Sequence, residues 1–285
     1  MSFYVDPASD AAKQAIAWAT SSPSQAALIR KIASQPTAKW FGDWDSDVLT
    51  DARAYVSAAA SAGKVPILVA YDIPLRDCGS YSAGGATSTA AYEEWMRNLA
   101  AGIGAHEAVV ILEPDALAMM DCLSSADQAA RYTLINDAIS TLKANPHTVV
   151  YLDAGNSNWI GAGDMAQRLI RGGIARADGF ALNVSNFYWT GDNVNFGQAV
   201  SALVGGKHFI VDTSRNGDGP DGSNWCNPSG RALGQPTTAN TGNPLVDGFL
   251  WTKTPGESDG TCNGGPAAGV WWPDYALGLA ERAAW

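Results

Sequence analysis

Short apolar runs that stop at polar residues recur along the chain, and each of them predicts a buried strand. The clearest is Val109–Leu112, in which three of the four residues are β-branched. Such a run is typical of a strand that is buried on both faces. Glu113, Pro114 and Asp115 follow, and the strand should end there because Pro114 has no N–H to donate to a neighbouring strand. Asp115 would then either cap the next helix or stand at the carboxyl tip of the strand.

Strand and helix patterns alternate along the rest of the chain. Similar apolar runs predict strands at 39–44, 65–71, 149–155, 179–186, 208–213 and 247–253. Helical patterns lie at 10–20, 24–33, 51–62, 87–102, 125–144, 164–171, 196–204 and from 274 to the end. The strand tips recur roughly every 30 to 40 residues, which is the rhythm of consecutive βαβ units and a parallel sheet.

Polar groups stand at the tip of every predicted strand: Asp43, Tyr71, Asp115, Asp153, Asn183, Asp212 and Lys253. One or two could be caps, but a full set on one edge describes a polar mouth over an apolar barrel. We therefore expect an α/β fold, a distorted, TIM-like (β/α) barrel of about seven parallel strands with a cleft at their carboxyl ends. A doubly wound open sheet is the alternative. Residues 1–285 should form a single catalytic domain.

Composition and charge narrow the range of partners. With 46% hydrophobic and 16% charged residues, the chain can bury a large core. Its net charge of −10 argues against nucleic acid and anionic membranes, and no apolar run approaches the length of a membrane span. We expect a neutral substrate and neither a nucleic-acid nor a membrane partner.

The chain has four cysteines: Cys78, Cys122, Cys226 and Cys262. None of them forms a CxxC pair, which argues against a zinc site or a dithiol redox motif. Four cysteines allow three pairings. The pairing between neighbours in sequence would tie loops on the same face of the barrel, and each bridge would contribute roughly 4 kcal/mol. We expect oxidised cysteines and a secreted, extracellular protein.

Several motifs do not fit their usual contexts. Gly161–Ala166 resembles a dinucleotide fingerprint, but it stands six residues past its strand and ends in Ala, so no cofactor is expected. Gly79–Gly84 lacks the spacing of a nucleophile elbow. No metal-ligand spacing and no hydrolytic triad is indicated by the three histidines, His106, His147 and His208.

The carboxylates are better candidates for chemistry. Asp77, Asp115, Asp153 and Asp259 all fall in or beside predicted strand tips. Acids that crowd one mouth repel each other, so at least one should stay protonated at neutral pH while another is ionised. Such a pair, surrounded by tryptophans, is what glycoside hydrolysis needs. Calcium binding is the weaker alternative, because no short stretch offers alternating oxygen ligands.

Eight segments, in order from about residue 40 to residue 262, resemble the catalytic domains of glycoside hydrolase family 6, the cellulases that invert at the anomeric carbon. The segments are VAYDIPLRDCG, VILEPDALA, VYLDAGNSNW, LNVSNF, VDTSRNG, NWCNPSGRALG, ANTGNPLVDGFLW and KTPGESDG.

The resemblance implies catalytic roles position by position. Asp115 would be the general acid that protonates the glycosidic oxygen. Asp77 would raise the pKa of Asp115 by like-charge repulsion and share its proton network. Asp259 would be the general base, flanked by Arg76 and Arg215, whose opposite charges would keep it ionised.

The resemblance also implies a substrate cleft. Tyr71 would crowd the sugar at the cleavage site and favour a distorted ring. Stacking platforms on either side of the cut would be Trp40, Trp159 and Trp225, and hydrogen-bonding residues would be Asp153, Asn186, Lys253 and Glu257. The family's two disulfides would correspond to Cys78–Cys122 and Cys226–Cys262.

Two positions depart from the family pattern. The usual DAGHxxW reads DAGNSNW, so Asn156 replaces a histidine and cannot titrate near neutral pH, which should change affinity on the product side. Ala83 stands where the family has Ser before its Gly pair, but the backbone carbonyl that is thought to hold the attacking water is retained. Neither change removes a catalytic carboxylate.

We therefore expect inverting endo-hydrolysis of β-1,4-glucosidic bonds in cellulose, β-glucan or cello-oligosaccharides by a monomer without a cofactor. The working carboxyl groups should stand roughly 6.5 to 9.5 Å apart. Endo action is favoured because the segments after Asp115 and Cys226 look too short to roof the cleft. The alternatives are an exo-acting cellobiohydrolase of the same family, an enzyme acting on another glycan, and a non-catalytic carbohydrate-binding barrel.

Overall fold

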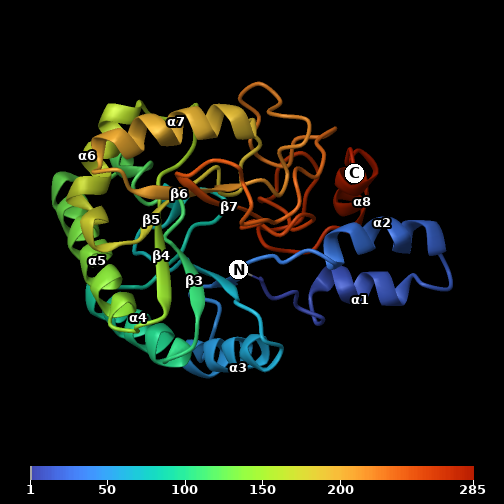
Figure 1. Cartoon of the computed structure of the whole chain (residues 1–285), viewed down its shortest axis with the longest axis horizontal. Coiled ribbons are helices and arrows are strands. Elements are labelled where there is room, and N and C mark those ends of the chain that lie inside the picture. The colour runs from blue at the N-terminus through green and yellow to red at the C-terminus, as the bar shows by residue number, and fades with distance from the viewer. Residues whose placement is uncertain (1) are drawn as a thin grey trace.

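Seven parallel strands form one curled sheet in which each strand pairs with the next along the chain (Figure 1). The computed structural model describes residues 2–285. The strands are β1 Lys39–Phe41, β2 Ile67–Ala70, β3 Ala108–Leu112, β4 Thr148–Asp153, β5 Gly179–Leu182, β6 His208–Asp212 and β7 Val246–Leu250. A doubly wound sheet would place later strands on both sides of the first one. The sequential order therefore confirms the distorted barrel and excludes that alternative.

The barrel closes at a narrow seam between its first and last strands. A single parallel bridge pairs Thr37 with Trp251, and the N–H of Ala38 donates to the carbonyl of Trp251 at 2.9 Å. The indole N–H of Trp40 crosses the same seam to the carbonyl of Thr252 at 2.8 Å. The distortion of the barrel is seen here, because β1 and β7 form no ladder with each other and the bridge lies outside the bounds of both strands.

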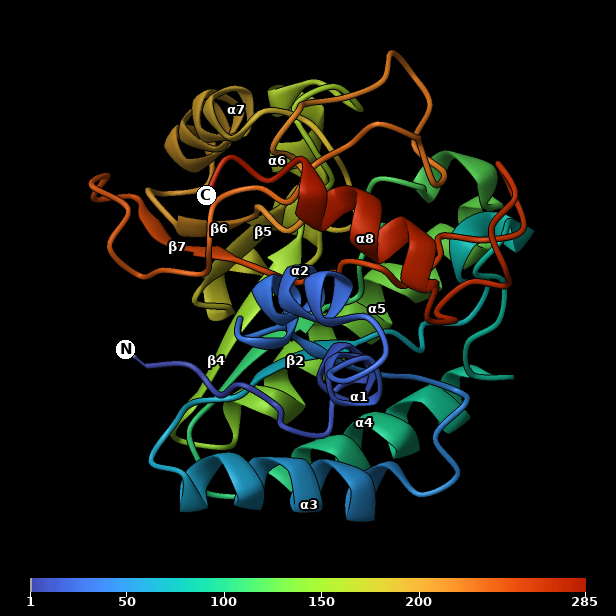
Figure 2. The ribbon, with the colours of Figure 1, turned by 90° about the vertical axis from the view of Figure 1, so that its right-hand side faces the viewer.

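Two groups of helices surround the sheet. Those that wrap its outer face are α3 Val48–Ser61, α4 Thr89–Ile103, α5 Ser125–Lys143, α6 Ala162–Arg171 and α7 Thr190–Leu203. Those that pack together beside the seam are α1 Asp10–Ala17, α2 Pro23–Ala33 and α8 Pro273–Glu281 (Figure 2). Within residues 2–285, no helix combines the length and the apolar character that a membrane span requires.

Two helices begin three or more residues earlier than the sequence pattern predicts. Helix α3 starts at Val48, where the Asp47 side chain caps it by accepting from the N–H of Thr50. Helix α7 starts at Thr190, six residues before the predicted start, and its first turns are polar. One of these polar residues, Asn193, is fully buried and accepts a hydrogen bond from the N–H of Ser157. Tertiary contacts therefore hold a turn that apolar periodicity cannot indicate.

The central strand β3 is buried on both faces, as predicted. Val110 and Leu112 belong to the cluster between the sheet and the outer helices. Val109 and Ile111 belong to the cluster inside the barrel. The strand therefore delivers Glu113 and the residues after it to the carboxyl end of the barrel from a rigid base.

Candidate functional site

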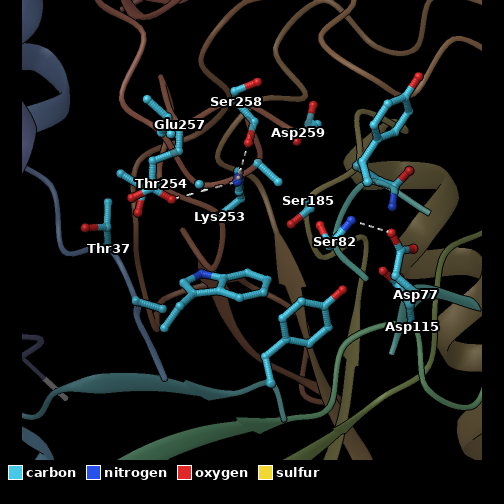
Figure 3. Close-up of a pocket in the computed structure, with 18 of the residues that line it drawn as sticks. Thr37, Asp77, Ser82, Asp115, Ser185, Lys253, Thr254, Glu257, Ser258 and Asp259 are labelled. Atoms are coloured by element: carbon cyan, nitrogen blue, oxygen red, sulfur yellow. Dashed lines mark hydrogen bonds and ion pairs between the residues drawn. The ribbon is translucent and has the colours of Figure 1, made fainter. Parts of the chain in front are cut away.

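A cavity of about 1110 Å³, lined by both polar and apolar side chains, opens at the carboxyl ends of the strands (Figure 3). Its lining includes three of the four acids singled out in the sequence: Asp77, Asp115 and Asp259. Typical small-molecule pockets measure about 300 to 1,000 Å³. The cavity therefore has room for an extended ligand.

Unusual backbone conformations place the acids in this cavity. Asp115 has φ 68° and Asp77 has φ 55°, a region that non-glycine residues rarely adopt. Ser185, which also lines the cavity, has φ 59°. Backbone strain of this kind is retained where surrounding contacts enforce it, and it gathers at functional sites. The fold thus holds these side chains in directions that regular strand or helix geometry would not give.

Asp115 lies half-buried at the base of the cavity, and its backbone N–H donates to Asp153 Oδ2 at 2.9 Å. Burial raises the pKa of Asp115 well above the usual carboxyl value, and the charges of Asp153, Asp77 and Asp259 raise this pKa further. The family resemblance had implied this effect of Asp77. Asp77 does raise the pKa of Asp115, but burial and the charge of Asp153 contribute more to the rise. Asp115 is consequently a group that can hold a proton at neutral pH.

Asp77 stands beside Asp115 in the view of Figure 3 and comes from the loop after β2. Its carboxylate accepts a hydrogen bond from the N–H of Ser82 at 2.7 Å. Burial raises the pKa of Asp77, although the Ser82 hydrogen bond and the charge of Arg76 oppose the shift. The predicted disulfide Cys78–Cys122 is confirmed, and it ties this loop to the segment after β3.

Arg131 also connects the loop after β2 with the segment after β3. This α5 residue is buried, and it donates to the carbonyl of Ala116 at 3.1 Å and to those of Pro74 and Leu75 at 2.9 Å each. The first carbonyl directly follows Asp115 in sequence, and the other two lie just before the Asp77 turn. Arg131 therefore fixes the two acidic loops relative to each other, a role that no sequence motif indicated.

Asp259 is held by partners from another part of the chain. The buried Arg215 donates to Asp259 Oδ2 at 2.9 Å, and the backbone N–H of Asn227 donates to the same oxygen at 3.0 Å. Burial alone would lower the pKa of Arg215, but the Asp259 charge raises it above its usual value. The second predicted disulfide, Cys226–Cys262, is also confirmed and ties these loops together. In Figure 3, Asp259 lies apart from Asp77 and Asp115.

Arg76 has a different partner from the one expected. Instead of Asp259, it pairs with Asp43 at 3.0 Å and donates to the carbonyl of Tyr71 at 2.7 Å. Its guanidinium carbon lies 4.7 Å from the centre of the Tyr71 ring. The side chain turns back towards the tips of β1 and β2, so of the two arginines expected beside Asp259 only Arg215 hydrogen-bonds it.

Most of the expected binding residues line the cavity: Trp40, Tyr71, Asn156, Trp159, Asn186, Trp225, Lys253 and Glu257. Asp153 is the exception, because it is only 1% exposed and does not line the cavity. It accepts hydrogen bonds from the N–H groups of Asp115 and Gly155, and burial raises its pKa to about 7. Its position corrects the prediction of a cleft residue: Asp153 lies beneath Asp115 and acts on it.

Trp40, Tyr71 and Lys253 form one wall of the cavity. The rings of Trp40 and Tyr71 meet edge to face at 5.2 Å. Lys253 Nζ lies 5.9 Å from the centre of the Trp40 ring and 3.8 Å from Glu257 Oε2. An apolar face beside paired charges suits a ligand that has both a flat apolar surface and hydroxyl groups.

Four aromatic residues of the cavity had not been assigned to it from the sequence: Trp44, Tyr55, Tyr81 and Tyr188. Trp44 is 54% exposed and ends the segment predicted as the first strand, and Tyr81 is 47% exposed in the long loop after β2. Aromatic residues in the segments just after predicted strands were the sequence signal that could have assigned Trp44 and Tyr81 to the cavity. In residues 2–285, no group of three or more His, Cys, Asp or Glu is arranged to hold a metal ion.

Comparisons with known proteins agree on one family. The model of glycosyl hydrolases family 6 matches residues 1–283. Endoglucanase A of Cellulomonas fimi is 45% identical over 287 residues, or 99% of this chain, and endoglucanase A of Thermobispora bispora is 46% identical over 291 residues, also 99% of this chain. The chain spans 62% of the length of each of these two relatives.

A solved structure shares both the fold and the sequence pattern. It is the endoglucanase Cel6 from Mycobacterium tuberculosis in complex with methyl-cellobiosyl-4-deoxy-4-thio-β-D-cellobioside. The TM-score is 0.94 at 45% identity, and the alignment covers 98% of this chain and 96% of that chain. A family match over nearly the whole sequence and a common fold at this identity together establish that the chain belongs to family 6 of the glycosyl hydrolases.

Proposed function

We propose that the chain is a cellulase domain that hydrolyses internal β-1,4-glucosidic bonds of cellulose or soluble β-glucan with inversion. The observation that carries this proposal is the contrast between two carboxyl groups of the cavity. The pKa of Asp115 is raised well above its usual value, whereas Asp259 is bound to the buried cation Arg215. One group is thereby suited to give a proton and the other to receive one.

In the proposed reaction, Asp115 donates its proton to the glycosidic oxygen as the bond to the anomeric carbon breaks. A water attacks that carbon from the opposite face, and its proton passes towards Asp259. The two products separate with the anomeric configuration inverted. Asp77, held by Ser82, raises the pKa of Asp115 and so helps to keep the proton in place.

The cavity lining supports a neutral glucan as the substrate. Trp40, Trp159 and Trp225 offer ring faces on which sugar rings stack, and Tyr71 stands against Trp40 where it would crowd the sugar next to the cut. Asn156, Asn186, Lys253 and Glu257 would hydrogen-bond sugar hydroxyls. The related Mycobacterium tuberculosis enzyme was solved with a thio-linked cellobioside.

The exposure of the platforms supports endo action. Trp159 is 39% exposed and Trp225 is 47% exposed, so neither is covered by a long loop. A glucan could enter such a cleft from the side instead of threading through a tunnel. A cellobiohydrolase would produce cellobiose from chain ends without lowering the viscosity of carboxymethyl cellulose, whereas an endoglucanase lowers the viscosity early.

Two disulfides also favour an extracellular location, because they persist in oxidising compartments. We expect the chain to act there as a monomeric catalytic domain.

The decisive experiment is hydrolysis of cellohexaose followed by proton NMR of the newly formed anomeric centre. We expect the α-anomer to appear first, together with reducing sugar from carboxymethyl cellulose. Initial release of the β-anomer would refute inversion and the roles of Asp115 and Asp259. Binding of cello-oligosaccharides without any hydrolysis would assign the chain to the non-catalytic alternative.

A further inference from the structure

The cavity does not end at Trp40. It continues beyond the wall of Trp40 and Lys253 to a group of residues to which the proposed function gives no role. We call this group the distal pocket, and its residues are Asp6, Asp10, Lys13, Lys39 and Tyr55. Figure 3 places Thr37 and Glu257 on the side of the cavity away from Asp77 and Asp115. The distal pocket lies past that side, next to the N-terminal segment.

Contacts between distant segments fix one wall of the distal pocket. Glu257 pairs with Trp271 in an antiparallel bridge, and the indole N–H of Trp271 donates to Gln14 of α1 at 3.4 Å. Asp10 and Lys13 belong to the same helix and form an ion pair at 3.3 Å. Helix α1 is thereby held beside the Glu257 end of the cleft.

The N-terminal segment and α3 supply the other residues of the distal pocket, which include Asp6 and Tyr55. The N–H of Tyr4 donates to the carbonyl of Val65 at 2.9 Å, and the Tyr4 ring meets that of Tyr55 edge to face at 5.4 Å. Asp6 is close enough to add to the rise that burial causes in the pKa of Tyr55. Tyr55 is half-buried, so its ring is fixed before any ligand arrives.

The chemistry of the distal pocket is mixed. Lys13 and Lys39 can donate hydrogen bonds, Asp6 and Asp10 can accept them, and Tyr55 adds an aromatic surface. An anion would be repelled by the aspartates, and a cation by the lysines. A neutral polyol, whose hydroxyl groups both donate and accept, matches all of these residues.

The geometry points to a further glucosyl-binding position in the distal pocket, which holds the third sugar counted from the cut on the Trp40 side. This inference rests on the proposed function, since it extends the same glucan past the Trp40 platform. It makes the distal pocket a determinant of where a long chain is cut, and it predicts that products of three or more units are released from the Trp40 side.

The test is the bond preference on cellohexaose that carries ¹⁸O at its reducing end, read by mass spectrometry of early products. The variant is the double replacement Lys13→Met with Lys39→Met. Both side chains are exposed, so folding should be preserved and is checked by thermal melting. Lys64→Met, an exposed lysine outside the cavity, is the matched control. Tyr55→Phe serves as a second variant, which removes only the hydroxyl group.

Two kinds of cut are compared: those that place three or more glucosyl units on the Trp40 side, and those that place two units there. We expect the double variant to lower the ratio of the first kind to the second. The fall should be about five- to tenfold, as for the loss of one or two net hydrogen bonds. Lys64→Met should keep the wild-type ratio. An unchanged ratio in both the double variant and Tyr55→Phe would overturn the assignment.

A binding measurement separates this inference from the proposed function. The affinity for thio-linked cellohexaose, compared with that for thio-linked cellotetraose, is measured by calorimetry and needs no turnover. If the wild type binds both ligands without hydrolysing cellohexaose, the proposed function fails while the distal pocket is still tested. Loss of the extra hexaose affinity in the double variant supports the distal pocket, and equal hexaose affinity in variant and wild type refutes it.

Discussion

Replacing Arg131 with methionine should damage catalysis from a position that the substrate does not reach. Arg131 is 3% exposed and donates hydrogen bonds to carbonyl groups of the Asp77 loop and of the Asp115 loop. Methionine fills a similar volume but donates nothing, so three carbonyls, one of them in a buried hydrogen bond, lose a charged donor. The two loops would then be joined by the Cys78–Cys122 disulfide with less support from the α5 side.

The size of the effect follows from these contacts. A hydrogen bond to a charged donor contributes about 1.5 to 3 kcal/mol, and part of that is recovered when water or neighbouring groups rearrange. We expect the free energy of unfolding to fall by about 4 kcal/mol and Tm by roughly 10 °C. A displacement of about 1 Å between catalytic groups can reduce a rate by a factor on the order of 100. We therefore expect kcat/KM on cellohexaose to fall about 100-fold well below Tm.

Arg168→Met is the matched control. Arg168 donates to the carbonyls of Leu117 and Ala118 and to Asp121, so it braces the loop after β3 without touching the Asp77 loop. It should lose stability but retain activity to within about fivefold, because the acids keep their relative positions. The reasoning would be refuted if Arg131→Met retained wild-type kcat/KM at 25 °C, or if the two variants lost activity equally for the same loss of stability.

Three further predictions concern the acid, a platform and the pH dependence of stability. Asp115→Ala should remove nearly all activity on cellulose, by a factor of about 10² to 10⁴, and less on aryl cellobiosides with a good leaving group; equal losses on both substrates would argue against Asp115 as the acid. Trp159→Ala should raise KM about tenfold and leave Tm nearly unchanged, since its ring is partly exposed, and a large fall in Tm would assign it to the core. Burial raises the pKa of Asp72 to about 8 and that of Glu113 to about 7, so the folded chain retains protons that the unfolded chain loses near pH 4. Tm should therefore fall as pH rises from 6 to 9, and it should fall less steeply in Asp72→Asn. A Tm that rises over this pH range would contradict the prediction.

The strands and their polar tips were predictable because burial on both faces leaves a strong local signature. The run Val109–Leu112 is apolar without interruption, and β3 covers this run and one residue before it. The alternation of strands and helices then restricts the sheet to parallel pairing. The start of α7 was not predictable in this way, since its buried Asn193 is stabilised by Ser157, a residue distant in sequence.

The partners of the charged residues were harder to predict. Asp153 is the last residue of β4 and Asp115 follows β3, yet Asp153 is nearly inaccessible and Asp115 faces the cavity. The left-handed backbone at Asp115 turns its side chain outwards while its N–H binds Asp153. Arg76 likewise lies next to Asp77 in sequence but pairs with Asp43. The burial and the pairing of charged residues depend on distances through space, and the spacing of residues along the sequence does not indicate these distances.

The sequence by itself determined the parallel barrel, the set of acids at its mouth and the family to which the chain is similar. Each of these follows from local patterns: apolar runs, residue types at strand ends and the order of motifs. Only the tertiary structure decided which acid is buried beneath which, that Arg131 joins the two acidic loops, and that the cavity continues past Trp40 to α1. The physical reason is that burial and electrostatic interaction depend on distances across the fold, and the chain sets these only when its distant segments pack together.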